Sequence, residues 1–208
     1  MGNPALLIID MQNDSCLPGA AFEVRGAVGV IPNIKKLLDA FRKHGLPVVH
    51  SAREYKADGT DIEITRRDRF LRSGGAFVPG TSGHAPVEGL EPVSGEAVVH
   101  RQRWSAFHKT DLETVLLAQE VELVVLAGVE TLGSIRCSAY DALALDLEVV
   151  VASDATMAGD AEAHKANLRD METVGIEVSS TDHIVWALPR RLGRRLRARR
   201  DEAKARQP

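Results

Sequence analysis

The segment LVVLAGVETLGSIRCSAYDALAL (residues 123–145) decides the fold, because a buried strand passes through a tight turn directly into a helix. Residues 123–128 form a near-continuous Val/Leu run, the pattern of a strand that is covered on both faces of a parallel sheet. Gly128 permits the turn, and residues 131–145 have the pattern of a helix. The amides at the start of this helix therefore predict a binding site for an anion or an oxyanion.

The same alternation of strand and helix extends along most of the chain. Further strands are expected at residues 5–10, 46–51, 96–101, 148–153 and 176–179, and further helices at 30–44, with Pro32 in the first turn, 111–119 and 160–174. Repeated strand–helix–strand units of this kind indicate an α/β fold. We expect three layers, with a doubly wound, mostly parallel, six-stranded sheet in the middle.

Composition limits the class of protein. The chain has 208 residues, of which 44% are hydrophobic, enough for a core in one domain. This excludes a collagen-like, low-complexity or wholly disordered chain. The apolar runs are too short to span a membrane, and we expect neither a secretory signal nor a membrane partner. The two cysteines, Cys16 and Cys137, form no disulfide framework, which predicts a cytoplasmic protein.

The net charge of −3 is the sum of two unlike parts. Residues 190–208 hold nine Arg or Lys and two acidic residues, a balance of +7, which leaves −10 for residues 1–189. We therefore divide the chain into a domain at 1–188 and a basic C-terminal tail at 189–208. A solvated tail, or one that contacts an acidic protein surface, is favoured over a nucleic-acid contact, since no aromatic residues are interleaved with the charges.

Three polar residues follow or end predicted strands, at the edge where parallel sheets bind ligands. Asp10 opens DMQND, Arg101 ends the third strand, and Ser134 lies in the first helical turn after Gly128. Each has a plainer interpretation: a turn former for Asp10, an ion pair with Asp10 for Arg101, and an N-terminal helix serine for Ser134. The long Gly- and Pro-rich stretch at 53–92 is expected to be a lid or a subunit contact.

Three motifs in order, IIDMQND, RWSAF followed by TDLE, and GVET leading into a helix, resemble the isochorismatase-like, or cysteine hydrolase, superfamily. The resemblance runs from residue 5 to about residue 182. It implies a six-stranded, mostly parallel, Rossmann-like sheet, which agrees with the fold expected from the pattern. It also implies a homo-oligomer, a dimer or a tetramer.

The resemblance further implies a catalytic group of Asp, Lys and Cys, in which the Asp accepts the thiol proton and the thiolate attacks an amide carbonyl. By position the Asp is Asp10, but Arg101 stands at the place of the Lys and Ser134 at the place of the Cys. Relatives often have a cis peptide in the turn, which corresponds to Val129–Glu130. Val129, Glu130 and Thr131 are the expected oxyanion turn.

The two replacements bear on the chemistry. An alkoxide is harder to form than a thiolate, and Arg cannot exchange a proton as Lys can. The chain is therefore either a cysteine-to-serine variant of a small-amide hydrolase or a member with other chemistry. The alternatives are vinyl-ether hydrolysis through Asp10 without a covalent intermediate, and a catalytically degenerate member that binds a ligand. Neither Cys137 nor Cys16 is expected to replace the nucleophile.

The substrate is expected to be a small amide or carboxylated molecule. The expected pocket residues are Trp104 and Phe107 from the SAF element, Arg53 and Tyr55 from the lid, and Ser15, where relatives often have Phe. For Phe107, a place in the core is an equal alternative. Nicotinamidases of the family carry an Asp and histidines after the second strand for a metal. Here no Asp-x-His pair follows, and His84 stands isolated in its loop, so that we expect no catalytic metal and no cofactor.

Overall fold

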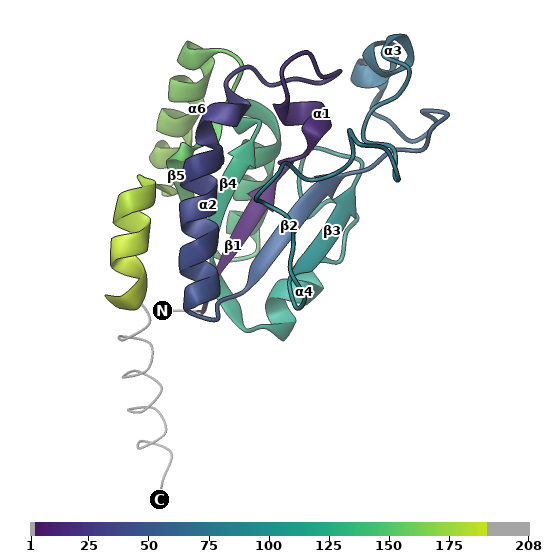
Figure 1. The fold of residues 1–208 in the computed structure, drawn as a ribbon. Helices are drawn as coiled ribbons and strands as arrows, with labels where there is room; N and C mark the ends of the chain where they lie inside the picture. The colour runs from purple at the N-terminus through teal and green to yellow at the C-terminus, as the bar shows by residue number, and fades with distance from the viewer. Residues whose placement is uncertain (1–2, 191–208) are drawn as a thin grey trace, which may run out of the picture.

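A computed structural model describes residues 3–190 of the chain. It contains a six-stranded sheet with helices on both faces (Figure 1). The strands are β1 (Asn3–Ile9), β2 (Val48–Arg53), β3 (Ala97–Arg101), β4 (Val121–Val129), β5 (Glu148–Met157) and β6 (Glu177–Ser179). The helices are α1 (Asn13–Cys16), α2 (Ala27–Lys43), α3 (Ile64–Arg72), α4 (Leu112–Ala118), the π-helical turn η1 (Thr131–Ile135), α5 (Arg136–Ala144) and α6 (Ala161–Thr173). Residues 181–190 are also helical.

All strand pairs are parallel, and the strand order is β3-β2-β1-β4-β5-β6. The predicted doubly wound sheet is confirmed, and it is parallel throughout. From β1 the chain adds β2 and β3 on one side and β4, β5 and β6 on the other, so that the strand order reverses between β1 and β4. Ligands bind at such a switch point, beyond the carboxyl ends of the strands. The residues that follow β1 and β4 therefore face one crevice.

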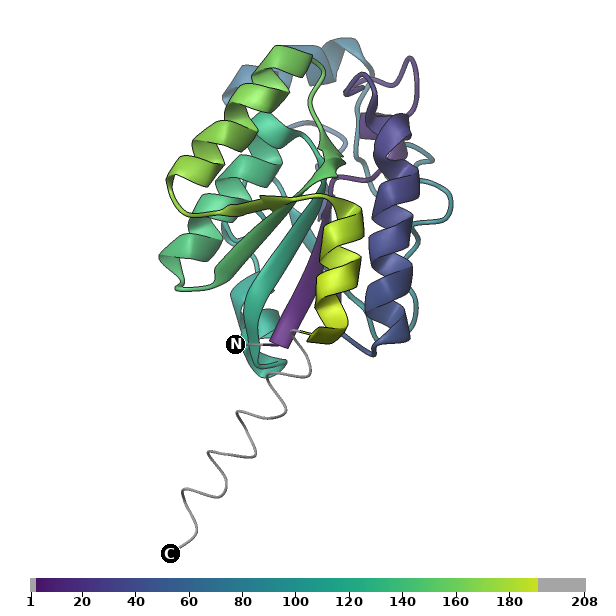
Figure 2. The same ribbon diagram turned by 90° about the vertical axis from the view of Figure 1, so that its left-hand side faces the viewer.

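Alternating residues of β1 build a core on each face of the sheet. Leu6 and Ile8 pack with α2 and with residues 181–190, whereas Leu7 and Ile9 pack with α4, α5 and α6. Figure 2 shows the two helical layers on either side of the sheet. β1 is buried on both faces, which explains its near-continuous run of apolar residues.

The strands lie close to their predicted ranges, whereas the helices differ in several places, since neither α1 nor the helical residues 181–190 were expected. α2 begins at Ala27, three residues earlier than expected, so that Pro32 lies inside the helix and not in its first turn. The stretch at 53–92, expected to be a lid or a contact segment, contains the helix α3. Its sequence ITRRDRFLR has one buried residue, Phe70, and therefore lacks the apolar period that would have predicted a helix.

Phe70 anchors α3 in a small third core with Phe22, Tyr55 and Phe77. The ring of Tyr55 meets those of Phe70 and Phe77 edge-on, at centroid distances of 5.9 and 6.1 Å. This core holds the α3 segment over the end of β2. The division between a domain at 1–188 and a tail at 189–208 stays a prediction, because most of the tail lies outside the described residues. Within residues 3–190, no helix is long and apolar enough to cross a membrane.

Candidate active site

Asp10 directly follows β1 and points into the crevice at the switch point. Its backbone has a φ of 54°, a left-handed conformation that Asp tolerates better than most residues. The side chain is buried, and its Oδ1 atom has no hydrogen-bond partner in the described part of the chain. A strained, buried carboxylate with a free acceptor atom is typical of a functional site.

Arg101, the last residue of β3, is fully buried and pairs with Asp10. Its Nη2 atom lies 2.7 Å from Asp10 Oδ2, and its Nε donates to Ser51 Oγ at 2.9 Å. Its Nη1 donates to the backbone oxygen of Arg103. These contacts confirm the ion pair with Asp10 and fix the plane of the guanidinium.

Ser134 lies in η1, on the other side of Asp10. Its Oγ donates to Asp10 Oδ2 at 2.8 Å and accepts from Arg53 Nη2 at 3.0 Å. The hydroxyl is thus buried between a carboxylate and a guanidinium. Arg101 and Ser134 stand 91 or more residues from Asp10 along the chain. All three residues nevertheless meet in one crevice, as their places at strand ends predicted.

Charge in the crevice keeps Asp10 ionised. Burial acts to raise its pKa, but Arg101, Arg53 and the hydrogen bond from Ser134 outweigh burial and hold the pKa below its usual range. Burial and the nearby Arg53 lower the pKa of Arg101. Its guanidinium nevertheless remains protonated near neutral pH. The arrangement can accept a proton at Asp10, and it favours negative charge beside Arg53.

The turn between β4 and η1 has the expected form. The peptide bond between Val129 and Glu130 is cis, and both residues line the crevice. Thr131, the third expected residue of the turn, is buried. Its Oγ1 lies 2.9 Å from Nδ1 of His164 in α6. Thr131 therefore connects the turn to α6.

Arg53 is the last residue of β2, and two neighbours position it. Its Nη1 donates to Glu63 Oε1 at 2.7 Å and to Tyr55 Oη at 2.8 Å, while Tyr55 donates to Glu63 Oε2 at 2.6 Å. Tyr55 is buried in the third core and does not line the crevice, so that its assignment as a pocket residue is wrong. Its aromatic ring packs against α3, and its hydroxyl orients Arg53.

The crevice encloses a small cavity of about 70 Å³. Trp104 lines it, as predicted, and so do Arg66 and Arg69 of α3, which no pattern in the sequence predicts at this site. The Arg66 guanidinium carbon lies 4.8 Å from the centre of the Trp104 ring and 4.6 Å from that of Phe22. The two arginines lie three residues apart and share a face of α3, but this spacing has a meaning only once the segment is known to be a helix.

Two further pocket predictions have different outcomes. Ser15 lines the cavity, and its Oγ donates to the backbone oxygens of Asp10 and Gln12, so that its hydroxyl is already satisfied. Phe107 was expected in the pocket wall, but it packs against the core with α4 and is absent from the cavity lining. Of the two aromatic residues of the SAF element, Trp104 thus lies in the crevice and Phe107 lies in the core.

Neither cysteine is placed to act as a nucleophile. Burial raises the pKa of the Cys16 thiol to about 12, and Cys16 Sγ lies 3.8 Å from the backbone oxygen of Asp10. Cys137 lies beyond Ser134 in a wide surface groove of about 600 Å³, and burial raises its pKa as well. Because a thiolate is the reactive form, both thiols are poor nucleophiles at neutral pH.

The histidines do not reach the crevice. His50 Nε2 lies 2.9 Å from Glu96 Oε2, on the side of β2 that faces away from Asp10. His84 was described as isolated, and this is wrong in space: its ring stacks on that of His100, with centroids 5.8 Å apart, and it faces Glu54. No residue of this group lines the cavity beside Ser134.

Comparisons with known proteins agree with the fold. The model of the isochorismatase domain matches residues 4–183. An isochorismatase family protein from Desulfovibrio vulgaris has a similar structure, with a TM-score of 0.86 and 41% identity over 93% of this chain and 100% of that one.

Two curated relatives carry functional names. A probable inactive nicotinamidase of Arabidopsis thaliana is 37% identical over 84% of this chain and 91% of the relative. Maleamate amidohydrolase of Pseudomonas putida is 34% identical over 82% of this chain and 79% of the relative. The similarity thus extends to an amidohydrolase and to a relative named as a probable inactive nicotinamidase.

Proposed function

The chain belongs to the isochorismatase-like hydrolase family, and we propose that its crevice binds a small carboxylated amide and hydrolyses it slowly at the carbon–nitrogen bond. The observation that carries the proposal is the position of Ser134 Oγ, 2.8 Å from Asp10 Oδ2 and 3.0 Å from Arg53 Nη2. A nucleophile, a base and a cation within hydrogen-bond distance form the arrangement that covalent catalysis needs.

The expected steps follow from these contacts. Asp10 accepts the proton of Ser134 while Oγ attacks the amide carbon, and Asp10 then gives this proton to the amide nitrogen, which leaves as ammonia or an amine. Water then cleaves the resulting ester and regenerates the hydroxyl. Val129, Glu130 and Thr131 form the turn beside the attacked carbonyl, and Arg101 holds Asp10 in position. The backbone amides of this turn are the proposed donors to the oxyanion.

The basic residues of the cavity support a carboxylated substrate. Arg53, Arg66 and Arg69 all line it, together with the aromatic ring of Trp104. A guanidinium binds a carboxylate through paired hydrogen bonds, and an aromatic face binds a planar group. Maleamate, the compound in the name of the Pseudomonas relative, combines a carboxylate with a planar amide.

The same geometry explains why turnover should be slow. Asp10 has a lowered pKa and is therefore a weak base for a serine hydroxyl, whose own pKa is far higher than that of a thiol. The lowered pKa also disfavours vinyl-ether hydrolysis, in which Asp10 would have to donate a proton. A second candidate is a ligand-binding member without turnover, which the name of the Arabidopsis relative favours.

The test restores the thiol with Ser134→Cys. Arg53 beside the new sulfur stabilises a thiolate, so that we expect at least about 100-fold faster turnover of maleamate, in line with the contribution of an activated nucleophile and its base. Intact-mass measurements should show an acyl-enzyme. Nicotinamide, which lacks a carboxylate, should be a poorer substrate than maleamate.

The matched control is Ser138→Cys, which places a buried thiol one turn further along α5, where Ser138 Oγ donates to the backbone oxygen of Ser134. It should gain no activity. If Ser134→Cys binds maleamate but releases no product and forms no adduct, the ligand-binding function replaces the proposed hydrolysis. If it neither binds nor turns over any carboxylated amide, the substrate class is wrong.

We also propose a cytoplasmic homo-oligomer, a dimer or a tetramer. Two free thiols fit a reducing compartment. The exposed apolar residues Ile64 and Leu71 of α3 support a subunit contact at the edge of the crevice, since Ile64 has 93% of its surface exposed.

A further inference from the structure

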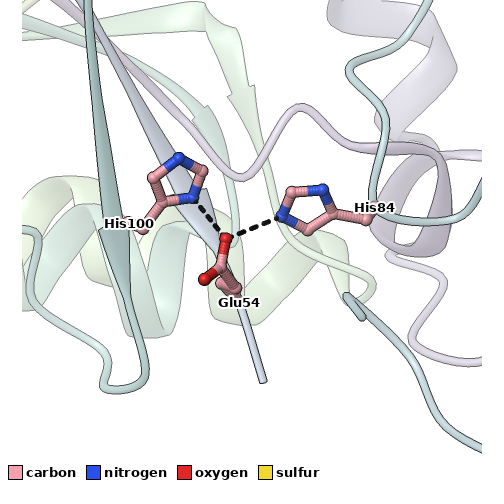
Figure 3. A group of neighbouring side chains, drawn as sticks. All are labelled: Glu54, His84 and His100. Atoms are coloured by element: carbon pink, nitrogen blue, oxygen red, sulfur yellow. Dashed lines mark ion pairs between the residues drawn. The ribbon is translucent and has the colours of Figure 1, made fainter. Parts of the chain in front are cut away.

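Glu54, His84 and His100 converge on one point although they lie in three separate parts of the chain. Glu54 follows β2, His100 lies in β3, and His84 lies in the loop between α3 and β3. Figure 3 shows both imidazole rings directed at the carboxylate of Glu54. Glu54 Oε2 lies 2.9 Å from His100 Nδ1 and 3.4 Å from His84 Nε2.

This cluster is separate from the crevice. Side chains alternate between the two faces of a strand. Arg53 and Arg101 are fully buried beside Asp10, whereas their neighbours Glu54 and His100 are partly exposed. His84 and His100 line a pocket that contains neither Asp10 nor Ser134. The cluster therefore faces away from the reacting atoms.

The contacts within the cluster leave hydrogen-bonding capacity unused. His84 Nε2 is buried and has no hydrogen-bond partner in the described part of the chain, although Glu54 lies within ion-pair distance of it. The two rings are stacked almost parallel, with an interplanar angle of 11°. Two protonated rings in this stack would repel each other, whereas a single cation between two neutral rings and a carboxylate would be attracted to all three.

We propose that Glu54, His84 and His100 form a binding site for a divalent transition-metal ion of the zinc class, on the face of the β2–β3 edge opposite the crevice. The three candidate ligand atoms lie within 4.8 Å of one another. A tetrahedral zinc ion, with bonds of about 2.0–2.2 Å to nitrogen and oxygen, requires ligand atoms about 3.4 Å apart. Small side-chain rotations satisfy this requirement, and water completes the fourth position.

The ion stabilises the loop that supports one wall of the crevice, from the opposite face of the sheet. Gln12 Nε2 donates to the backbone oxygens of His84 and Arg53, and Gln12 Oε1 accepts from the amide of Arg53. A metal that ties His84 to Glu54 and His100 would therefore hold the loop that supports Gln12. This places the ion in a positioning role for Arg53 and not in the chemistry at Ser134.

Metal binding is measured directly on the full-length protein, first stripped of metal with a chelator. Calorimetry with Zn²⁺ should show one ion per chain, and Co²⁺ should give the intense visible absorption of a low-symmetry, four-coordinate site. The thermal midpoint should rise with Zn²⁺, because a ligand that binds the folded state stabilises it.

Variants locate the site. Loss of a residue that only supports a metal ligand typically weakens binding by about 10- to 100-fold. Because His84 and His100 are proposed as direct ligands, His84→Ala and His100→Ala should each weaken Zn²⁺ binding by more than this. His44→Ala, which removes an exposed histidine at the end of α2, should bind zinc like the unmodified protein. The proposal is wrong if the protein binds no zinc, or if the double variant of His84 and His100 retains the same affinity and stoichiometry.

Discussion

Arg101 shows how one residue can preserve charge and still change chemistry. It keeps a cation 2.7 Å from Asp10, where the family resemblance implies a lysine. Its guanidinium is held in place by Ser51 and by the backbone of Arg103, and it does not release a proton near neutral pH. In the proposed mechanism, Arg101 therefore orients Asp10 and takes no part in proton transfer.

We therefore predict that Arg101→Lys, introduced into the Ser134→Cys protein, raises kcat for maleamate by about 10-fold or more, because lysine can exchange a proton with the leaving group. Steady-state kinetics with both variants provides the measurement. Arg103→Lys, at an exposed neighbouring position, is the matched control and should leave kcat unchanged. An Arg101→Lys protein that folds, binds maleamate and is no faster would show that the cation serves only to hold Asp10.

At the scale of elements, Glu96 links the start of β3 to α2 and β2. Its carboxylate accepts from Arg42 Nε at 2.7 Å and from the amide of Val93 at 3.0 Å, and it lies 2.9 Å from His50 Nε2. Burial acts to raise the pKa of Glu96, but these hydrogen bonds outweigh burial and lower the pKa to about 2. The ionised carboxylate therefore stabilises the folded state.

Glu96→Gln should reduce the free energy of unfolding at pH 7 by about 1–3 kcal/mol, the range for hydrogen bonds to charged groups. Because the folded pKa of Glu96 lies below the unfolded value of about 4.3, its contribution is present above that value and is lost as the pH falls toward about 2. Urea denaturation at several pH values should show the difference between the two proteins shrinking in that window. The exposed Glu88→Gln is the control, and a pH-independent difference for Glu96→Gln would contradict the assignment.

The α3 helix, like α1 and the helical residues 181–190, was not predicted from the sequence. Phe70 is its one buried residue, and it packs in the third core with Tyr55 and Phe77, which lie outside the helix. A helix that depends on tertiary contacts gives a weak local signal. The same reason hid Arg66 and Arg69, since their place in the crevice depends on where α3 lies.

At the scale of the whole molecule, the two halves of the sheet meet at Gly128. It has a φ of +116°, and a Cβ atom added there would lie 2.1 Å from the backbone oxygen of Ile9. The contact is between two backbones in the centre of the sheet, so neither can move without displacing β1 or β4. Only glycine allows this close approach.

Gly128→Ala should therefore lower the free energy of unfolding by more than about 3 kcal/mol, because it combines a disfavoured φ with a backbone clash. Thermal denaturation followed by circular dichroism is the measurement. Gly29→Ala is the matched control: it lies in α2, where an added Cβ meets nothing within 4 Å, and it should be neutral or slightly stabilising. Equal midpoints for the two variants would contradict the close approach of β1 and β4.

The acidic body and the basic tail can be tested by shortening the chain after Arg190. The family match ends at residue 183, and Leu188 packs in the core. Light scattering should give the same dimer or tetramer mass for both lengths, and duplex DNA should bind both equally weakly at physiological salt. A loss of oligomer mass, or of DNA binding, on shortening would assign the tail that function.

The sequence by itself determined the order and kind of most strands and helices, because near-continuous apolar runs specify strands buried on both faces. It also placed Asp10, Arg101 and Ser134 at one edge of the sheet, since parallel strands carry their carboxyl ends to the same side. These inferences need only local pattern and topology.

Tertiary structure decided what depends on side-chain direction and on contacts between distant segments. It put Trp104 in the crevice and Phe107 in the core, and it turned Tyr55 from a pocket residue into the partner of Arg53. It also brought His84 and His100 together on Glu54, although these residues lie in separate elements. No pattern along the chain encodes these contacts between distant residues, because they depend on how α3 and its flanking loops pack against the sheet.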